Sequence, residues 1–181
     1  VIVTAEDIPG INDCAIVIQG DPIFIKEKET SNYFGQPLFA IGCSSRRAAL
    51  KAVKKAIIKY ETLKPIITIK DALKKNSYIS KPTEVKKGNP LKKISEAKHS
   101  ITGNFKTGAQ DHLYLEPQSC FAMPKEDNDL LIYASTQNPS KTQSIIAKML
   151  KQKINSINVK TVRLGGGFGG KESSFLGSCI A

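Results

Sequence analysis

A run of six residues with five glycines, at positions 165–170, constrains the chain more than any other segment. Glycine tolerates positive φ and lets other atoms approach its N–H group closely. The run follows a strand-like stretch at 157–162, so it is expected to form a loop whose amides can point at an anionic group. Its spacing matches neither the dinucleotide nor the Walker pattern, which leaves a tight turn without ligand equally open. Phe168 favours a ligand, because an exposed ring can stack on a flat heterocycle.

The length of 181 residues suits one domain of ordinary size or parts of two. With 40% hydrophobic residues the chain can form a core, which excludes wholesale disorder. No apolar run is long enough for a spanning helix, and the first residues lack a secretory signal pattern. The chain begins at Val1 and ends within an apolar stretch at Ala181, so we expect an internal fragment of a longer protein.

The net charge of +11 is concentrated in residues 46–98, which hold 16 Lys or Arg against 4 Asp or Glu. This basic third leaves a nucleic-acid-binding domain as a non-enzymatic alternative. Nucleic-acid modules usually add aromatic stacking or arginine forks to backbone charge, whereas here only Tyr60 and Tyr78 interleave with lysines. A solvated lysine-rich surface is therefore the favoured interpretation.

The four cysteines lie far apart in the sequence, without the paired spacing that zinc or iron–sulfur ligation needs. We interpret them as small, partly buried thiols of a reduced protein, which favours a cytoplasmic location. His99 and His112 are the only histidines, and no motif supports a two-histidine metal site or a Ser-His-Asp relay.

The pattern of short apolar runs and helical stripes predicts a mixed α+β fold. A helix is expected to begin after the capping residues Ser44 and Ser45 and to extend to about Tyr60, and another begins at Asn138-Pro139. A short helix is expected at 71–74. Strands are expected at 37–42, 65–69, 101–105, 114–116, 119–123, 130–134 and 157–162.

Residues 71–100 are polar, rich in lysine and interrupted by Pro82, Gly88 and Pro90. A loop this long is unusual within one compact unit, so the sequence predicts a domain junction near 63–65 and a long crossing segment after it.

Two segments together resemble a known family. Residues 165–173 (GGGFGGKES) are similar to the glycine-rich cofactor loop of the molybdenum hydroxylases, the family of xanthine dehydrogenases and aldehyde oxidases, and residues 108–116 (GAQDHLYLE) resemble its second signature. Ala109 and Asp111 depart slightly from that signature. Three further segments agree in order and spacing: 5–10 (AEDIPG), 34–39 (FGQPLF) and 135–140 (STQNPS).

The resemblance implies the fold and the cofactor. Residues 1–62 would be the C-terminal part of an alpha/beta hammerhead domain, and residues 63–181 the N-terminal part of a molybdopterin-binding domain. Gln110, Gly166, Gly167 and Phe168 would contact the molybdenum–molybdopterin cofactor, with Gln110 and Phe168 nearest the metal. A neutral amide such as that of Gln110 can donate to a metal-bound oxygen without adding charge.

Glu172 falls where xanthine-specific members hydrogen-bond the purine, and a carboxylate there discriminates strongly between heterocycles. A glutamate favoured by a helix dipole is the alternative. The resemblance implies oxidation of xanthine or hypoxanthine by hydroxylation at a purine carbon, with an aldehyde oxidase or another aromatic-heterocycle hydroxylase as the related alternative. The catalytic glutamate and the substrate arginine of the family would lie outside this chain.

The resemblance also implies partners. Electrons would pass to 2Fe-2S clusters, FAD and NAD, with the clusters and FAD on other domains or on a partner subunit. The assembly would be a dimer of heterodimers or a homodimer, with no membrane association.

Overall fold

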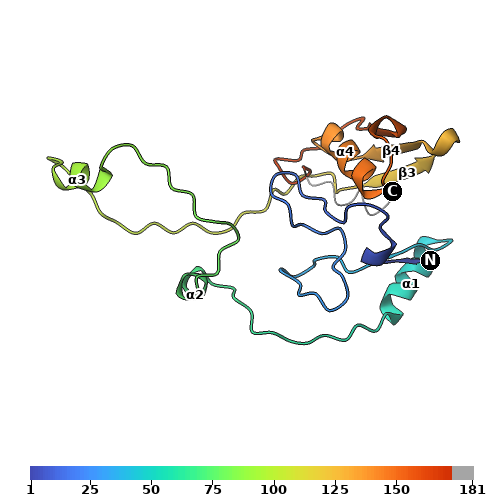
Figure 1. Ribbon diagram of the computed structural model, residues 1–181, viewed down its shortest axis with the longest axis horizontal. Coiled ribbons are helices and arrows are strands. Elements are labelled where there is room, and N and C mark those ends of the chain that lie inside the picture. Colours follow the sequence, from blue (N-terminus) through green and yellow to red (C-terminus); the bar gives the residue numbers. More distant parts are fainter. Residues whose placement is uncertain (173–181) are drawn as a thin grey trace. The chain divides into compact units, whose positions relative to one another are not determined.

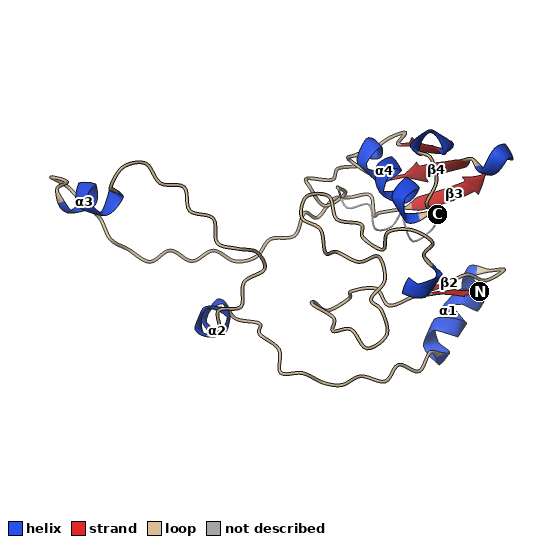
Figure 2. Ribbon diagram, in the orientation of Figure 1, coloured by secondary structure: helices blue, strands red, loops and turns tan. Residues whose placement is uncertain are grey.

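A three-stranded sheet and one helix form the best-packed part of the computed structural model, which describes residues 1–172 (Figures 1 and 2). β3 (Cys120–Pro124) pairs antiparallel with β4 (Leu130–Ala134), and β4 pairs parallel with β5 (Ile157–Lys160). The turn between β3 and β4 contains the 3-10 turn η2 (Glu126–Asn128). Asp127 and Asn128 have positive φ there, a conformation that these two residue types tolerate better than most.

Helix α4 (Pro139–Met149) connects the parallel strands β4 and β5. It begins where it does because the Asn138 side chain accepts a hydrogen bond from the Lys141 amide at 3.1 Å, and because Pro139 suits a position whose N–H has no helical partner. A short 3-10 turn, η3 (Ile154–Ser156), leads from α4 to β5. The helix buries its apolar face in a core with both strands: Leu130, Ile132, Ile145, Ile146, Ala147, Met149 and Ile157.

The first 56 residues belong to the same compact unit as the sheet. They contribute Ala5, Cys14, Ile23 and Phe24 to its core. β1 (Ile2–Val3) and β2 (Ala40–Ile41) form a short antiparallel pair, and η1 (Ala5–Asp7) follows β1. Most of the chain between η1 and β2 is irregular (Figure 2).

Gly10 fits closely against the end of α4. A Cβ at this position would collide with the Lys148 carbonyl oxygen, and the Ile11 amide donates to that oxygen at 3.1 Å. Glycine therefore permits a close approach between the irregular N-terminal chain and the helix.

Helix α1 (Arg46–Lys55) begins at Ser45, whose hydroxyl accepts from the Ala48 amide at 3.2 Å as expected. It ends at Lys55, so the prediction of helix to about Tyr60 was too long. None of its residues is buried, which leaves the last part of the apolar stripe without a surface to hold it in helical form.

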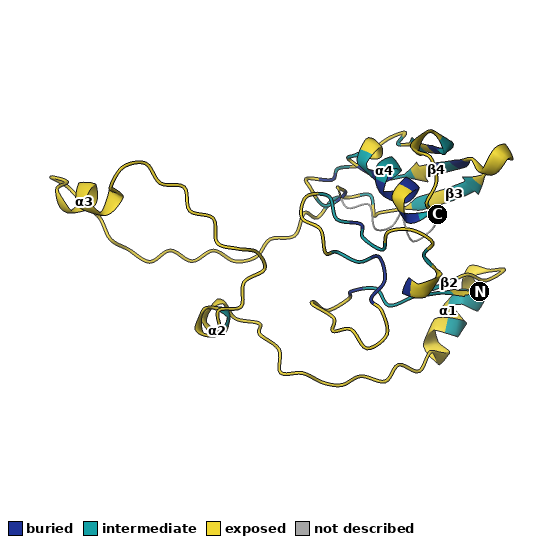
Figure 3. Ribbon diagram, viewed as in Figure 1, coloured by how far each residue is buried: buried dark blue, intermediate teal, exposed yellow. Residues whose placement is uncertain are grey.

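Residues 57–109 form a second unit, with two short helices, α2 (Ile69–Lys74) and α3 (Pro90–Ser95). No residue of this unit is buried (Figure 3). The short helix predicted at 71–74 is confirmed, whereas α3 was not predicted.

Three predicted strands are wrong: 65–69, 101–105 and 114–116 are not strands in the structure. At 65–69 a local hydrogen bond decides the outcome, because the Thr68 hydroxyl accepts from the Asp71 amide at 3.1 Å and α2 begins at Ile69. The other two have no pairing partner among residues 1–172.

The mixed α+β fold is confirmed, with the strands predicted at 119–123, 130–134 and 157–162 present with small shifts of their ends. No helix within residues 1–172 has the length and apolar character needed to cross a membrane. The predicted domain boundary between residues 62 and 63 stays a prediction. Residues 173–181, which include the end of the loop motif at Ser173, lie outside the described residues.

Candidate functional site

Gln137, between β4 and α4, holds the C-terminal half of the glycine-rich loop. Its side-chain oxygen accepts hydrogen bonds from the amides of Gly169 and Lys171 at 3.0 and 3.2 Å. The backbone N–H of Gln137 donates to the Lys171 carbonyl oxygen at 2.9 Å. A Cβ at Gly167 would overlap the Gln137 side chain, so a residue with a side chain could not pack here without displacing it. Gln137 therefore makes three hydrogen bonds that fix one end of the loop.

Glu116, the last residue of the second signature, holds the other end. One carboxylate oxygen accepts from the Gly165 amide at 2.7 Å and lies 3.2 Å from the Lys171 ammonium nitrogen. The hydrogen bond from Gly165, and then the one from Lys171, lower the pKa of the Glu116 carboxyl from its ordinary value of 4.5. Glu116 is therefore a carboxylate at neutral pH, and it links both ends of the loop.

Lys171 is buried, with 0% of its side chain exposed. Its ammonium group lies 4.7 Å from the centre of the Tyr114 ring, within range of a cation–π interaction. Gln118 adds two further hydrogen bonds: its side-chain amide donates to the Gly170 carbonyl oxygen at 2.7 Å and to the Tyr114 hydroxyl at 3.0 Å. The segment that carries the second signature thus packs directly on the loop.

Three consecutive amides between the two fixed ends have no partner among the described residues. The N–H groups of Gly166, Gly167 and Phe168 donate to no acceptor in the part of the chain that the structure describes. Gly166 has a φ of 93°, a conformation that favours glycine, and Phe168 has a φ of 52°. Adjacent free amides in a bent loop can donate hydrogen bonds to one anionic or oxygen-rich group.

The Phe168 ring stays outside the core. Its side chain is 73% exposed, and ring atoms lie 3.0 and 3.3 Å from where a Cβ on Gly166 would stand. Three free amides beside an exposed aromatic face fit a flat cofactor that carries oxygen atoms and negative charge. Within residues 1–172 no three His, Cys, Asp or Glu side chains form a group that could hold a metal ion.

The remaining predicted site residues lie at the surface. Gln110 is exposed on irregular chain and forms no hydrogen bond within residues 1–172. Glu172 is exposed at the end of the loop, and its amide donates to the Gly169 carbonyl oxygen at 3.3 Å. The structure brings Gly166, Gly167, Phe168 and Glu172 into one loop. The approach of Gln110 to that loop stays a prediction.

Sequence reasoning missed the residues that hold the loop. Glu116 and Lys171 were both inside recognised motifs, and Gln137 lies in the segment 135–140, yet none was assigned a role. Nothing in a single sequence pairs Glu116 with Gly165 and Lys171, which lie 49 and 55 positions away. The one available signal was the presence of a lysine directly after the glycine run.

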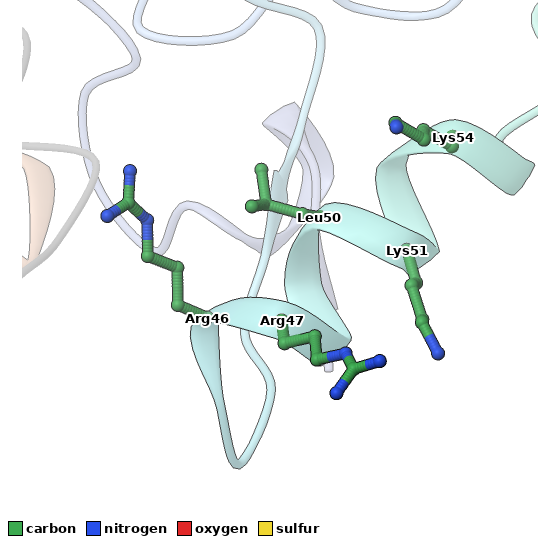
Figure 4. A pocket seen from close by; sticks show the side chains of 5 residues that line it. All are labelled: Arg46, Arg47, Leu50, Lys51 and Lys54. Atoms are coloured by element: carbon green, nitrogen blue, oxygen red, sulfur yellow. The ribbon is translucent and has the colours of Figure 1, made fainter.

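Two hollows lie elsewhere on the first unit. One, of about 450 Å³, runs along α1 and is lined by Arg46, Arg47, Leu50, Lys51 and Lys54. Figure 4 shows its basic side chains pointing in different directions, as on a solvated helix face. The other, of about 540 Å³, lies between residues 9–11 and the end of α4. Neither contains a predicted site residue.

Comparison with known proteins agrees with this geometry. Residues 69–181 match the model of the molybdopterin cofactor-binding domain family. The chain is 44% identical over 98% of its length to a xanthine dehydrogenase of Dictyostelium discoideum, and 38% identical over 94% to aldehyde oxidase 2 of Macaca fascicularis. It spans only 13% and 12% of the lengths of those two proteins.

Among solved structures, quinoline 2-oxidoreductase from Pseudomonas putida 86 matches with a TM-score of 0.76 and 19% identity. The match covers 94% of this chain and 24% of that chain. At this identity the match supports the fold alone. The family match over more than half the chain shows that it belongs to the molybdopterin cofactor-binding domains, among relatives that are xanthine dehydrogenases and aldehyde oxidases.

Proposed function

We propose that the chain is part of a molybdenum hydroxylase that oxidises xanthine or hypoxanthine at a purine carbon. The observation that carries the proposal is the loop itself, in a chain of the molybdopterin cofactor-binding family. It presents an exposed phenyl ring and three adjacent amides that have no acceptor in the described part of the chain. The relatives named xanthine dehydrogenase support the choice of substrate.

Each residue of the loop has a role in this proposal. The amides of Gly166, Gly167 and Phe168 would bind oxygen atoms of the cofactor, and the Phe168 ring would lie beside it. The side-chain amide of Gln110 would donate a hydrogen bond to the cofactor. When bound, the cofactor supplies the redox chemistry that adds oxygen to the substrate carbon and takes up two electrons.

Glu172 selects the substrate in this proposal. Its exposed carboxylate, two residues beyond the last glycine of the loop, accepts hydrogen bonds from ring N–H groups of the purine. A ligand that lacks those donors leaves the carboxylate unpaired, which is costly once water is excluded.

The electron carriers and the assembly belong to the parent protein. We propose that 2Fe-2S clusters and FAD, on other domains or a partner subunit, pass the electrons to NAD. We propose a cytoplasmic enzyme that is a dimer of heterodimers or a homodimer. The predicted division into a hammerhead part over 1–62 and a molybdopterin-binding part over 63–181 belongs to the same proposal.

Replacement of Glu172 tests the substrate. In the full-length protein, Glu172→Gln should lower kcat/KM for xanthine at least tenfold, roughly the loss of one charged hydrogen bond, while aldehyde turnover changes little. Glu126→Gln, an exposed glutamate in the β3–β4 turn, is the matched control.

Molybdenum content, measured on the same samples, should be equal in all three proteins. Equal loss on both substrates would remove the case for xanthine and favour an aldehyde oxidase or another heterocycle hydroxylase, which the aldehyde oxidase relative supports. Absence of molybdenum and pterin from the wild-type protein, made in a host that synthesises the cofactor, would contradict the whole proposal.

A further inference from the structure

The glycine-rich loop is fixed at both ends by side chains from distant parts of the chain. Glu116 binds the amide of Gly165, where the loop begins. Gln137 binds the amides of Gly169 and Lys171, where it ends. Between these points lie the three amides that have no partner within residues 1–172.

A loop of this composition does not keep such a shape by itself. Glycine has more conformational freedom to lose on ordering than any other residue, so five glycines in six positions favour many competing conformations. Several of those conformations would turn the free amides toward carbonyl groups of the chain or toward solvent. The side-chain hydrogen bonds at both ends restrict the loop before any ligand arrives.

Burial makes one of these contacts hard to replace. Lys171 has no exposed side-chain surface, and Glu116 is its only ion-pair partner within residues 1–172. Removing the charge of Glu116 leaves a buried cation whose one remaining partner within residues 1–172 is the Tyr114 ring. The Glu116 side chain is 41% exposed, so the cost of removing its charge falls on Lys171. A buried charge left without its partner costs more than replacing both partners with neutral groups.

We propose that Glu116, Gln137 and Lys171 are positioning residues that hold the loop in the shape in which the Gly166, Gly167 and Phe168 amides are available to the cofactor. None of the three donates to the cofactor in this proposal; they act through the loop backbone. The inference rests on the proposed function, because it names what keeps that cofactor loop in place.

Hydrogen–deuterium exchange tests the contacts without the cofactor. In the full-length protein prepared cofactor-free, Gln137→Ala and Glu116→Gln should raise exchange in peptides that cover 165–172 about tenfold, the usual scale for losing one or two protecting hydrogen bonds. Gln152→Ala and Glu126→Gln replace exposed residues of the same types and should leave these peptides unchanged. If the loop peptides of both Gln137→Ala and Glu116→Gln exchange at the wild-type rate, the proposal is overturned.

Cofactor retention tests the consequence. After purification, Gln137→Ala and Glu116→Gln should hold several-fold less molybdenum and pterin than the wild type, with unchanged far-UV circular dichroism. The fraction that keeps the cofactor should show an altered molybdenum EPR spectrum, which a merely stabilising contact would not change.

The double variant Glu116→Gln with Lys171→Met removes both charges. It should recover much of the retention that Glu116→Gln loses, because no buried charge is left unpaired. If the double variant retains less molybdenum and pterin than Glu116→Gln alone, the role of the ion pair is overturned.

The outcomes separate the two proposals. Faster loop exchange with full cofactor retention and a wild-type EPR spectrum overturns the positioning role and leaves the proposed function intact. A wild-type protein without molybdenum and pterin contradicts the proposed function. In that case the exchange experiment still decides whether these residues hold the loop.

Discussion

Glu116 combines two contacts that depend on its charge. The Gly165 amide and the Lys171 ammonium group stabilise the carboxylate and lower its pKa below 4.5. A group whose pKa is lower in the folded state stabilises that state above its unfolded pKa, and the contribution is lost as the pH falls through the folded value. Loop stability should therefore depend on pH through this residue.

We predict that the difference in loop exchange rate between wild type and Glu116→Gln is largest at pH 7 and shrinks below about pH 4.5. The reason is that a protonated carboxyl resembles the neutral side-chain amide of glutamine. Comparing the two proteins at each pH cancels the intrinsic pH dependence of exchange. A difference that stays constant from pH 7 to pH 3.5 would show that the charge of Glu116 contributes nothing to the loop.

At the residue scale, sequence reasoning located the loop but not its supports. Phe168 was singled out because a lone ring among glycines has no evident structural use, and the structure leaves that ring exposed. Gly167 was expected to lie beside a ligand; the structure adds a packing reason, since a Cβ there would overlap Gln137. Contacts of this kind depend on how distant segments fold together, which local patterns do not encode.

At the element scale, two helices share a capping device but differ in what they bury. Asn138 caps α4 and Asn89 caps α3. Each side-chain oxygen accepts a hydrogen bond from a backbone N–H of the first turn at 3.1 Å. Helix α4 contributes several residues to the core, whereas α3 buries none. The same substitution should therefore have different consequences in the two helices.

We predict that Asn138→Ala lowers the free energy of local opening of α4 by about 1 kcal/mol, the usual value of such a cap. The measurement is native-state hydrogen exchange of α4 amides in the full-length protein. Asn89→Ala, the matched control, should leave α4 unchanged. Unchanged exchange of α4 in Asn138→Ala would mean that the packing of that helix, not its cap, determines where it begins.

The elements that were predicted correctly are those with both a local signal and a partner nearby in sequence. β3 and β4 are joined by a short turn, and α4 has Asn138-Pro139 at its start and an apolar face against the adjacent strands. The strand predicted at 101–105 has strand-favouring residues at Ile101, Thr102 and Phe105 but no strand beside it among residues 1–172. Residue type alone does not make a strand, since the ladder hydrogen bonds need a second chain segment.

At the scale of the whole molecule, the two units differ in kind. The first has a core built from the N-terminal segment, the sheet and α4. The second, Ile57–Ala109, carries 12 lysines against 4 acidic residues and no buried side chain. Several of its large apolar residues are almost fully exposed, among them Ile79, Val85 and Ile101. This unit lacks the apolar burial that offsets the entropy of ordering a chain.

We predict that a peptide of residues 57–109 does not fold cooperatively. Its two helices have six residues each, well below the roughly 12–15 at which isolated helices begin to persist in water. Far-UV circular dichroism at neutral pH should show mainly irregular chain, with a gradual, featureless change on heating. A sigmoidal thermal transition that is independent of peptide concentration would contradict this, because it would require a core that this unit does not have.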